Sequence, residues 1–368
     1  MMIRRYKHLL IAAFSVFCVL FTNLSFSQEH TQNDTTTNHT EAKHNDDNVD
    51  VNALIMEHIQ DDYSWHLWGH TSISLPVILY SDKGFEVFSS HHLVNDEHES
   101  VVYQGKNSYK NFEGSIKVVN TDGSINEEET AKVWDFSITK NVASLLISVT
   151  LLLVIFISVG GAYKKRGVTT APKGLQSFME PVILFVRDTV AKPNIGHHYR
   201  KFMPFLLTIF FLVLVNNFLG LIPIFPGGAN LSGNIAFTMI LAVLVFIVTN
   251  VNGTKDYWGH IFWMPGMHWT MKLFLAPIEL IGVFTKPISL MIRLFANITA
   301  GHILVLSLIC LIFIFKSIYA SAVAVPFAVF IGVIECLVAF LQAFIFTLLS
   351  AMYIGMSTAK HHHDESHH

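Results

Sequence analysis

Charged residues are scarce in this chain, where aspartate, glutamate, lysine and arginine make up 14% of 368 residues. Soluble domains usually contain about 25%. The charges nearly cancel, and the formal net charge of -3 at pH 7 argues against a nucleic-acid partner. Apolar residues make up 52% of the chain and give it a mean hydropathy of +0.46. This composition predicts a membrane protein with several spans.

Cysteine is also rare, and Cys18, Cys310 and Cys336 each lie in an apolar run without the spacing of a zinc or redox motif. We interpret them as small apolar residues, and we expect no metal and no cofactor. Histidine is frequent instead. His66 and His70, four residues apart, would share a helix face as metal ligands, but surface histidines in a His-rich chain are the simpler interpretation. Residues 360–368 form a His-rich tail.

The N-terminal third is expected to be exported. Basic residues precede an apolar run at residues 9–20, and small residues follow it, which predicts a signal peptide over residues 1–27. An uncleaved anchor helix is the alternative, although the run is short for a span. Residues 28–50 contain almost no large apolar side chains and are predicted to be disordered outside the cytoplasm.

Residues 51–139 are predicted to form a small external subdomain with β-strands. Strand-like stretches at residues 72–80, 84–88 and 115–119 are separated by turn signals such as Asp82-Lys83-Gly84.

Residues 140–359 are predicted to form the membrane domain. A first span at residues 142–163 ends at Lys164-Lys165-Arg166, which indicates that this end is cytoplasmic. Residues 174–190 have the pattern of an amphipathic helix at the cytoplasmic surface, with Pro181 at its start or at a kink. Residues 203–222 and 231–251 then form a helical hairpin whose turn is external, and the polar and aromatic stretch at residues 252–272 is expected to be a cytoplasmic loop.

Two longer apolar runs follow, at residues 273–315 and 318–359. Each is about twice as long as a span needs, and neither contains a polar loop. We therefore expect two long, steeply tilted helices. The predicted fold class is an all-α polytopic membrane protein made of one span, a surface helix, a hairpin and two long tilted helices, with a small external N-terminal region and a cytoplasmic C-terminus.

Ionisable residues recur inside the first long helix. Glu279, Lys286 and Arg293 are seven residues apart and share one helix face, while His302 lies about half a turn away from it. A charge at the bilayer centre costs roughly 2.5–3.5 kcal/mol on insertion scales, so Arg293 is a functional residue by default. Alternatively, Lys286 and Glu279 have no functional role and either pair with each other or extend their charged ends to the membrane–water interface.

The second long helix carries Glu335 and Gln342, again seven residues apart. If the two helices are antiparallel, Gln342 comes near Arg293 and Glu335 comes near His302. Glutamate and histidine at such depth are typical of proton relays. Four amides, taken singly, are equally well explained as polar residues that hydrogen-bond a neighbour in the bundle: Asn216, Asn217, Asn297 and Gln342.

Two motifs resemble a known family. Residues 287–297 read Pro-Ile-Ser-Leu-Met-Ile-Arg-Leu-Phe-Ala-Asn, with Ala300-Gly301 after them, and residues 341–346 read Leu-Gln-Ala-Phe-Ile-Phe. Together they resemble the signature of subunit a of F-type ATP synthases, the membrane stator of the rotary proton channel. The resemblance covers roughly residues 142–359, and the family pattern does not explain residues 28–135.

The resemblance implies a role for each polar residue. Arg293 would face the carboxylates of the subunit c ring, with Asn297 and Gln342 beside it. His302 and Glu335 would belong to a half-channel, and some relatives carry this pair exchanged, which favours a mutual contact. Asn216, Asn230 and Asn234 match half-channel positions loosely, and Glu279 and Lys286 would support the site. The implied partners are the subunit c ring, the subunit b stalk and the bilayer of a bacterial inner membrane, with the N-terminal region periplasmic and no catalytic site in this chain.

Two other classes of protein remain open. A secondary transporter or ion channel would use Arg293 to bind an anionic substrate, and it should have internal repeats, which the two halves of the chain lack. A structural membrane scaffold would not need Arg293, His302 and Glu335 at depth.

Overall fold

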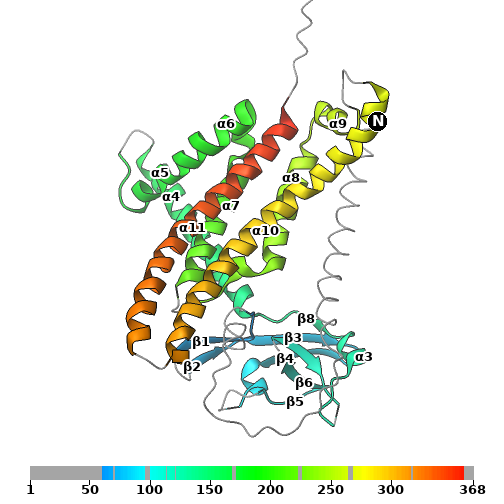
Figure 1. Cartoon of the computed structure of the whole chain (residues 1–368), viewed down its shortest axis with the longest axis vertical. Coiled ribbons are helices and arrows are strands. Elements are labelled where there is room, and N and C mark those ends of the chain that lie inside the picture. The colour runs from blue at the N-terminus through cyan, green and yellow to red at the C-terminus, as the bar shows by residue number, and fades with distance from the viewer. Residues whose placement is uncertain are drawn as a thin grey trace, which may run out of the picture.

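The computed structural model describes residues 60–359, apart from 69–70, 96–99, 113, 121, 168–170, 223–225, 264–267 and 316–317. The predicted signal peptide (1–27), disordered segment (28–50) and His-rich tail (360–368) lie outside the described residues. Within the described part, four helices are long and apolar enough to cross a membrane, or five if one bent pair counts as a span. The prediction of a mostly helical polytopic membrane protein is therefore confirmed. Figure 1 shows the helices together, with a β-containing part at one end of them.

The β-containing part has three small antiparallel sheets. Strands β1 (Ser64–Trp68) and β2 (Thr71–Ser74) form the first sheet. The second has the order β4-β3-β8, from β3 (Pro76–Ser81), β4 (Gly84–Ser89) and β8 (Trp134–Asp135). The third has the order β5-β6-β7, from β5 (Tyr103–Gln104), β6 (Ser108–Phe112) and β7 (Ser115–Val118). Two short helical turns, η2 (Ser90–Leu93) and α3 (Glu127–Thr130), complete it.

Alternation along the strands builds one core between these sheets. Val77 and Leu79 on β3 and Tyr109 on β6 are fully buried. Tyr80, which follows Leu79 and therefore points to the opposite face of β3, is exposed. The expected strand at 72–80 is divided at Leu75 into β2 and β3. His66 lies in β1 rather than on a helix, and His70 lies outside the described residues, so the alternative of two ligands on one helix face is wrong.

Hydrogen bonds attach the β-containing part to the helices. The Trp65 indole Nε1 donates to the carbonyl oxygen of Gly227, in the turn between the two hairpin helices, at 3.0 Å. The Asn141 backbone N–H, in the first turn of the helix at residues 140–166, donates to the Asp61 carboxylate at 3.0 Å. Within the β-containing part itself, the Tyr63 hydroxyl donates to Asp135 of β8 at 2.5 Å. Burial and the Asp135 carboxylate raise the pKa of Tyr63 well above its usual value, so the hydroxyl stays a donor.

Replacing Trp65 with phenylalanine is expected to loosen the attachment to the hairpin turn. The ring still fills the site, but the buried Gly227 carbonyl loses the indole donor, which costs about 1–3 kcal/mol. Hydrogen exchange of the amides at residues 226–230 should accelerate. The matched control is Trp134→Phe, because Trp134 is exposed and makes no such bond to the turn. Equal exchange rates in the two variants would contradict the attachment.

The first group of helices lies in the chain between the β-containing part and the two long helices. Helix α4 (Lys140–Arg166) corresponds to the expected first span. Helix α5 (Leu175–Phe185) continues through the π-helical turn η3 (Val186–Ala191), α6 (Lys192–Ile195) and the short turn η4 (Gly196–His198). Helices α7 (Tyr199–Leu221) and α8 (Ile235–Val251) correspond to the expected hairpin and are joined through η5 (Leu231–Gly233). Pro181 does not begin a helix, because it lies in the middle of α5.

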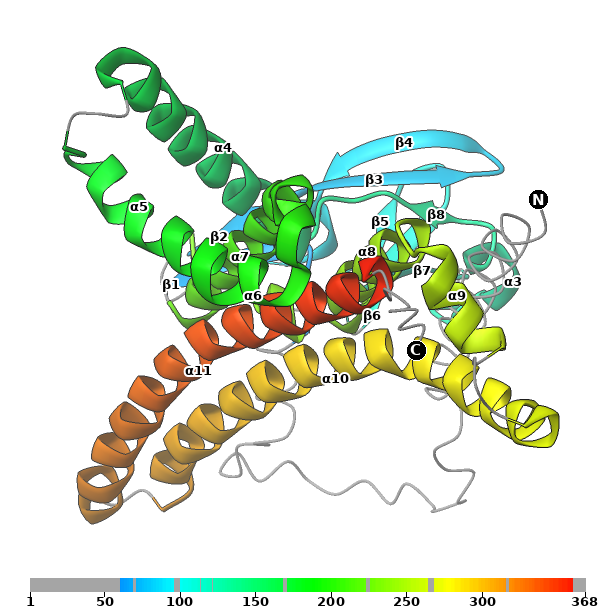
Figure 2. The same cartoon turned by 90° about the horizontal axis from the view of Figure 1, so that it is seen from above.

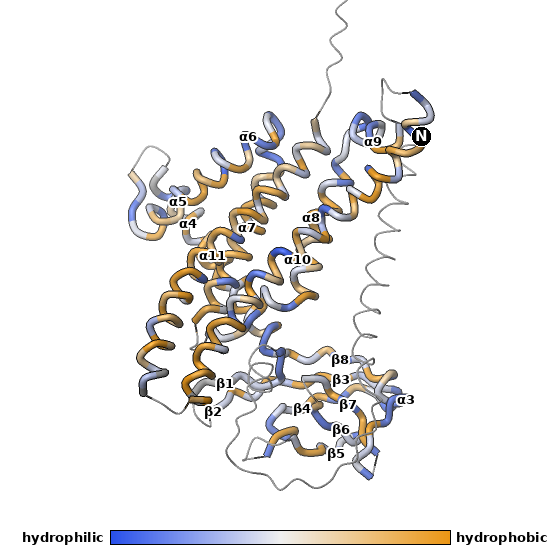
Figure 3. The backbone as a smooth tube through the Cα atoms, in the orientation of Figure 1, coloured by the Kyte–Doolittle hydropathy of each residue, from blue (hydrophilic) through white to orange (hydrophobic). Residues whose placement is uncertain are grey.

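Three helices complete the chain. Helix α9 (Lys255–Phe262) bends by 103° from α8, in a stretch that we expected to be a loop. The Thr254 side chain accepts a hydrogen bond from the Tyr257 backbone and begins α9, a local signal that the loop prediction missed. Helices α10 (Trp269–Phe315) and α11 (Ile318–Thr358) are the two long helices. Figure 2 shows them curving side by side along one edge of the molecule, and Figure 3 shows that both are largely apolar.

The helices pack around a core dominated by α7, α8 and α11. Leu206, Phe210 and Val213 of α7 are fully buried, as are Leu294 of α10 and Ile354 of α11. By contrast, the most apolar 18-residue stretch of α10 is only 11% buried by the rest of the described chain, and the same is true of α11. One long side of this helix pair is therefore left without a partner from the described residues.

Candidate functional site

Arg293 lies near the middle of α10 and has no anionic partner. It is half-buried, as are Glu279 and Lys286 on the same helix face. Arg293 makes no ion pair and no hydrogen bond with any other described residue. Asn297, one turn further along, is exposed. A charge in an apolar helix normally needs a counter-charge, and the described residues supply none for Arg293.

Lys286 faces an aromatic ring rather than Glu279. Its Nζ lies 5.7 Å from the ring centre of Tyr353 on α11, a cation–π contact that joins the two long helices. The alternative in which Lys286 and Glu279 pair with each other is therefore wrong: no ion pair joins these two described residues. Tyr353 lies within reach of Lys286 because α11 runs alongside α10, whereas Glu279 is two turns away on the same helix.

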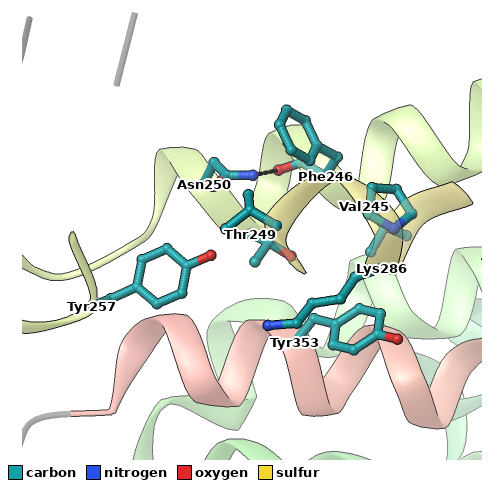
Figure 4. A pocket seen from close by; sticks show the side chains of 9 residues that line it. Val245, Phe246, Thr249, Asn250, Tyr257, Lys286 and Tyr353 are labelled. Atoms are coloured by element: carbon teal, nitrogen blue, oxygen red, sulfur yellow. Dashed lines mark hydrogen bonds between the residues drawn. The ribbon is translucent and has the colours of Figure 1, made fainter. Parts of the chain in front are cut away.

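Beside Lys286 is a small polar cavity of about 20 Å³, which suffices for one water molecule. Figure 4 shows Thr249 and Asn250 of α8 and Tyr257 of α9 around it, together with Lys286 and Tyr353. The Thr249 hydroxyl and the Asn250 side-chain oxygen are buried there without a hydrogen-bond partner. These groups are suited to hold a bound water between α8 and the two long helices.

His302 points from α10 toward the hairpin. A Cβ built on Gly220 of α7 would lie 3.8 Å from His302 Nε2, 3.5 Å from the Ala229 carbonyl oxygen and 4.0 Å from the Cα of Asn230. The Nε2 atom is buried without a hydrogen-bond partner, and so is the Nδ2 of Asn230. Two orphaned polar groups near one glycine indicate a small polar pocket at the turn end of the hairpin.

The Glu335 carboxylate lies against Gly301 of α10. A Cβ built on Gly301 would fall 2.1 Å from Glu335 Oε1, so the carboxylate occupies the space that the missing side chain leaves. Glu335 and His302 are both described, and no hydrogen bond or ion pair joins them, so their expected mutual contact stays a prediction. Successive residues on a helix point about 100° apart, so the side of Gly301 is not the side of His302.

The buried amides of α7 link the helices. Asn216 donates to the Leu212 carbonyl of its own helix at 2.7 Å, and its Oδ1 is buried without a partner. Asn217, which sequence reasoning did not single out for the site, donates to the Ala339 carbonyl of α11 at 3.1 Å. Ala339 lies between Glu335 and Gln342, and Gln342 is buried. The adjacent Asn216-Asn217 pair was visible in the sequence, but which of the two reaches α11 depends on helix packing.

Asn230 and Asn234 are N-cap residues, of η5 and α8 respectively. The Asn230 side chain accepts a hydrogen bond from Gly233 N at 2.9 Å, and Asn234 accepts one from Ala236 N at 2.9 Å. Both are helix-capping contacts. No hydrogen bond or ion pair joins any two of the ten predicted site residues, all of which are described. Among the described residues, no group of three metal-ligating side chains gathers.

The fold and the site define a polytopic membrane protein whose polar residues lie on two long paired helices, with an unpaired arginine near the middle of one. A family model described as ATP synthase A chain matches residues 142–355, more than half of the chain. The chain belongs to this family. In ATP synthase, subunit a is the non-catalytic membrane stator part of the complex, which agrees with the prediction that this chain has no catalytic site.

Several curated relatives are similar to a large part of this chain. "ATP synthase subunit a 2" of Chlorobaculum tepidum is 48% identical over 240 residues, 64% of this chain and 66% of that protein. The protein of the same name from Chlorobium luteolum is 51% identical over 231 residues, 61% of this chain and 66% of that protein. "ATP synthase subunit a" of Chloroherpeton thalassium is 48% identical over 240 residues, 64% of this chain and 71% of that protein.

The chain thus spans about two thirds of the length of the curated relatives that it matches. A second family model, described as a domain of unknown function (DUF8433), matches residues 54–136, which include all the strands.

Proposed function

We propose that this chain is the proton-translocating stator subunit of a rotary F-type ATP synthase. The observation that carries the proposal is the lone charge of Arg293, half-buried on an apolar helix without an anion from its own chain. In this role its partner is a carboxylate on the moving ring of subunit c. The chain would also assemble with the subunit b stalk and the other subunits of the complex.

A fixed guanidinium acts on such a carboxylate through its charge. At about 4 Å and an effective dielectric constant of about 20, two unit charges attract by about 4 kcal/mol. That energy corresponds to a fall of about three units in the pKa of the carboxylate. The carboxylate therefore releases its proton when it passes Arg293. The guanidinium, which stays charged, also blocks direct proton transfer between the two sides.

The uncovered side of the long helix pair supplies the surface for the ring. Ile292, one residue before Arg293, is exposed, and so are Val333 and Leu337 of α11. At about 1.5 Å per residue, α10 is about 70 Å long, more than twice the hydrocarbon thickness. A long tilted pair with the curvature visible in Figure 2 suits a cylindrical partner that slides past.

Two polar paths would serve the ring. His302 and Asn230 lie near Gly220 of α7, Asn216 is on the same helix as Gly220, and Glu335 lies beside Gly301; these residues would line one path. Asn297 lies one helical turn from Arg293 on α10, and the family resemblance implies Gln342 of α11 as the other polar neighbour of Arg293. Glu279 and Lys286, with the cavity beside Tyr353, would support the second path from the other end of α10.

The same proposal fixes the orientation and the domains. Residues 51–139 would form an external, periplasmic domain, residues 140–359 the membrane domain, and the C-terminus would be cytoplasmic in a bacterial inner membrane. The basic cluster at the end of α4 supports this orientation. Each proton that crosses contributes about 2.3 kcal/mol per 100 mV to rotation.

Replacing Gly301 with alanine tests the proposed path in the complex purified through this chain. The new methyl group would overlap Glu335 Oε1, so the carboxylate must move, and ATP-driven proton pumping into vesicles should fall several-fold. The control is Gly161→Ala on α4, where a Cβ meets nothing within 4 Å. Unchanged pumping by the Gly301 variant, or a purified complex that lacks a ring-forming subunit, would refute the assignment.

A further inference from the structure

The outer face of the β4-β3-β8 sheet is apolar and uncovered within the described part of the chain. Tyr80 pairs directly with Phe85 on one side and with Trp134 on the other, so the three side chains share a face. Val87 and Phe136 each lie two residues further along their segments and join the same face. We call these five residues the aromatic face. Each is between 54% and 65% exposed.

The opposite face of this sheet already carries the core. Val77, Leu79 and Phe88 point inward and pack with residues of β6 and β7. An antiparallel sheet with one face buried normally alternates to polar side chains on the other face. Single exposed apolar residues are ordinary, but five adjacent ones with three different aromatic types indicate a surface that is covered in the working protein.

The aromatic face is close to the membrane along the chain. Phe136 precedes the first residue of α4, Lys140, by four positions, a distance of at most about 14 Å for extended chain. Helix α4 is apolar enough to cross a membrane, and its 27 residues extend for about 40 Å, which matches a bilayer together with its headgroup layers. Lys140 therefore begins at headgroup level, and the aromatic face lies within reach of that layer.

The direction of the face and its composition favour the same occupant. In Figure 1 the third sheet, β5-β6-β7, lies on the side of the second sheet that is farther from the helices, so the aromatic face is turned toward the helical side. Helix α4, which follows the sheet in the chain, also has apolar side chains on its surface, and Leu146, Leu153 and Ile157 are each more than half exposed. Tryptophan and tyrosine are enriched at membrane–water interfaces, since their rings are apolar and their polar atoms reach water.

We propose that the aromatic face lies in the lipid headgroup layer of the bilayer that α4 crosses. The β-containing part is then a membrane-contacting module, held at two places: by lipid at the aromatic face and by Trp65 at the hairpin turn. This inference depends on the membrane embedding of the helices and not on proton translocation.

Spin labels on the full chain in lipid nanodiscs test the proposal. The three native cysteines are replaced by serine, and single cysteines are introduced as Val87→Cys on the aromatic face and Ser115→Cys on β7, an exposed control on the other sheet. Collisions with oxygen, which concentrates in lipid, and with a water-soluble nickel chelate are measured at each site. The ratio of oxygen to nickel collisions should be several-fold higher at Val87 than at Ser115.

Two outcomes would overturn the proposal. If Val87 is as accessible to nickel as Ser115, the face is in water. If Val87 is shielded from both reagents, a protein surface covers it, either another subunit or residues 1–59 of this chain. Quenching of tryptophan fluorescence by brominated lipids is an independent measurement without cysteines. The quenched fraction should fall in Trp134→Phe while the exposed Trp263 and Trp269 still contribute, and an unchanged quenched fraction would contradict the lipid contact.

Discussion

Replacing Arg293 with alanine should abolish ATP-driven proton pumping by the assembled complex while leaving the complex intact. Arg293 makes no internal ion pair or hydrogen bond with a described residue, so its removal breaks no contact that holds the helices together. In the proposed role, the variant lacks the charge that would lower the proton affinity of the passing carboxylate. Passive proton leak through the membrane should rise, because the barrier between the two sides disappears.

The measurement compares pumping and leak in inverted vesicles for Arg293→Ala, Arg293→Lys and Arg200→Ala. Lysine should fail as well, because desolvation neutralises it more easily than arginine. Arg200, exposed at the start of α7, is the matched control and should pump at the normal rate. Coupled pumping that survives in Arg293→Ala would exclude the stator assignment. Loss of anion uptake with normal ATP-driven pumping would instead indicate a transporter.

Replacing Gly355 with alanine should destabilise the helical core more than any other glycine-to-alanine change in α11. A Cβ at residue 355 would lie 1.9 Å from the backbone oxygen of Asn194 in α6, and a backbone cannot rotate away as a side chain can. The two helices must separate, at a cost of about 1–3 kcal/mol or more. The fraction of monodisperse chain after heating in detergent reports the change.

Gly332 provides the opposite expectation on the same helix. A Cβ there meets nothing within 4 Å, so Gly332→Ala removes only backbone freedom from the unfolded chain. It should be neutral or stabilise by about 0.5–1 kcal/mol. If the two variants shift the midpoint of thermal unfolding by the same amount and in the same direction, the close approach of α6 and α11 is wrong.

Much of the helical framework followed from hydrophobic length. The run at residues 273–315 has no polar loop, and it forms one helix that begins four residues earlier than expected, at Trp269. Helix α9 was not predicted, because it is short and polar and its N-capping residue Thr254 lies in a segment that was predicted to be a loop. The steep tilt of the long helices remains a prediction, since it is defined only relative to a bilayer.

The candidate site was predictable as a set of residues but not as a set of contacts. A charge in an apolar run, such as Arg293, is visible in sequence because its cost is local. Contacts between helices depend on how far one helix is shifted along the other, which periodicity does not determine. For that reason the sequence suggested a contact of Glu335 with His302, whereas the carboxylate occupies the space beside Gly301. The buried role of Asn217 depends on the same packing.

The bond between Trp65 and Gly227 joins residues 162 positions apart, which affects the order of assembly during synthesis. At about 5–20 residues per second, the ribosome completes the segment around Trp65 roughly 8–30 s before Gly227 is made. The eight strands of the described residues all precede α4 in the chain, so the sheets can fold before the hairpin is inserted. The N-terminal part would then act as a template on which the hairpin turn closes. A defect in its folding would consequently appear first as a misassembled hairpin rather than as a missing domain.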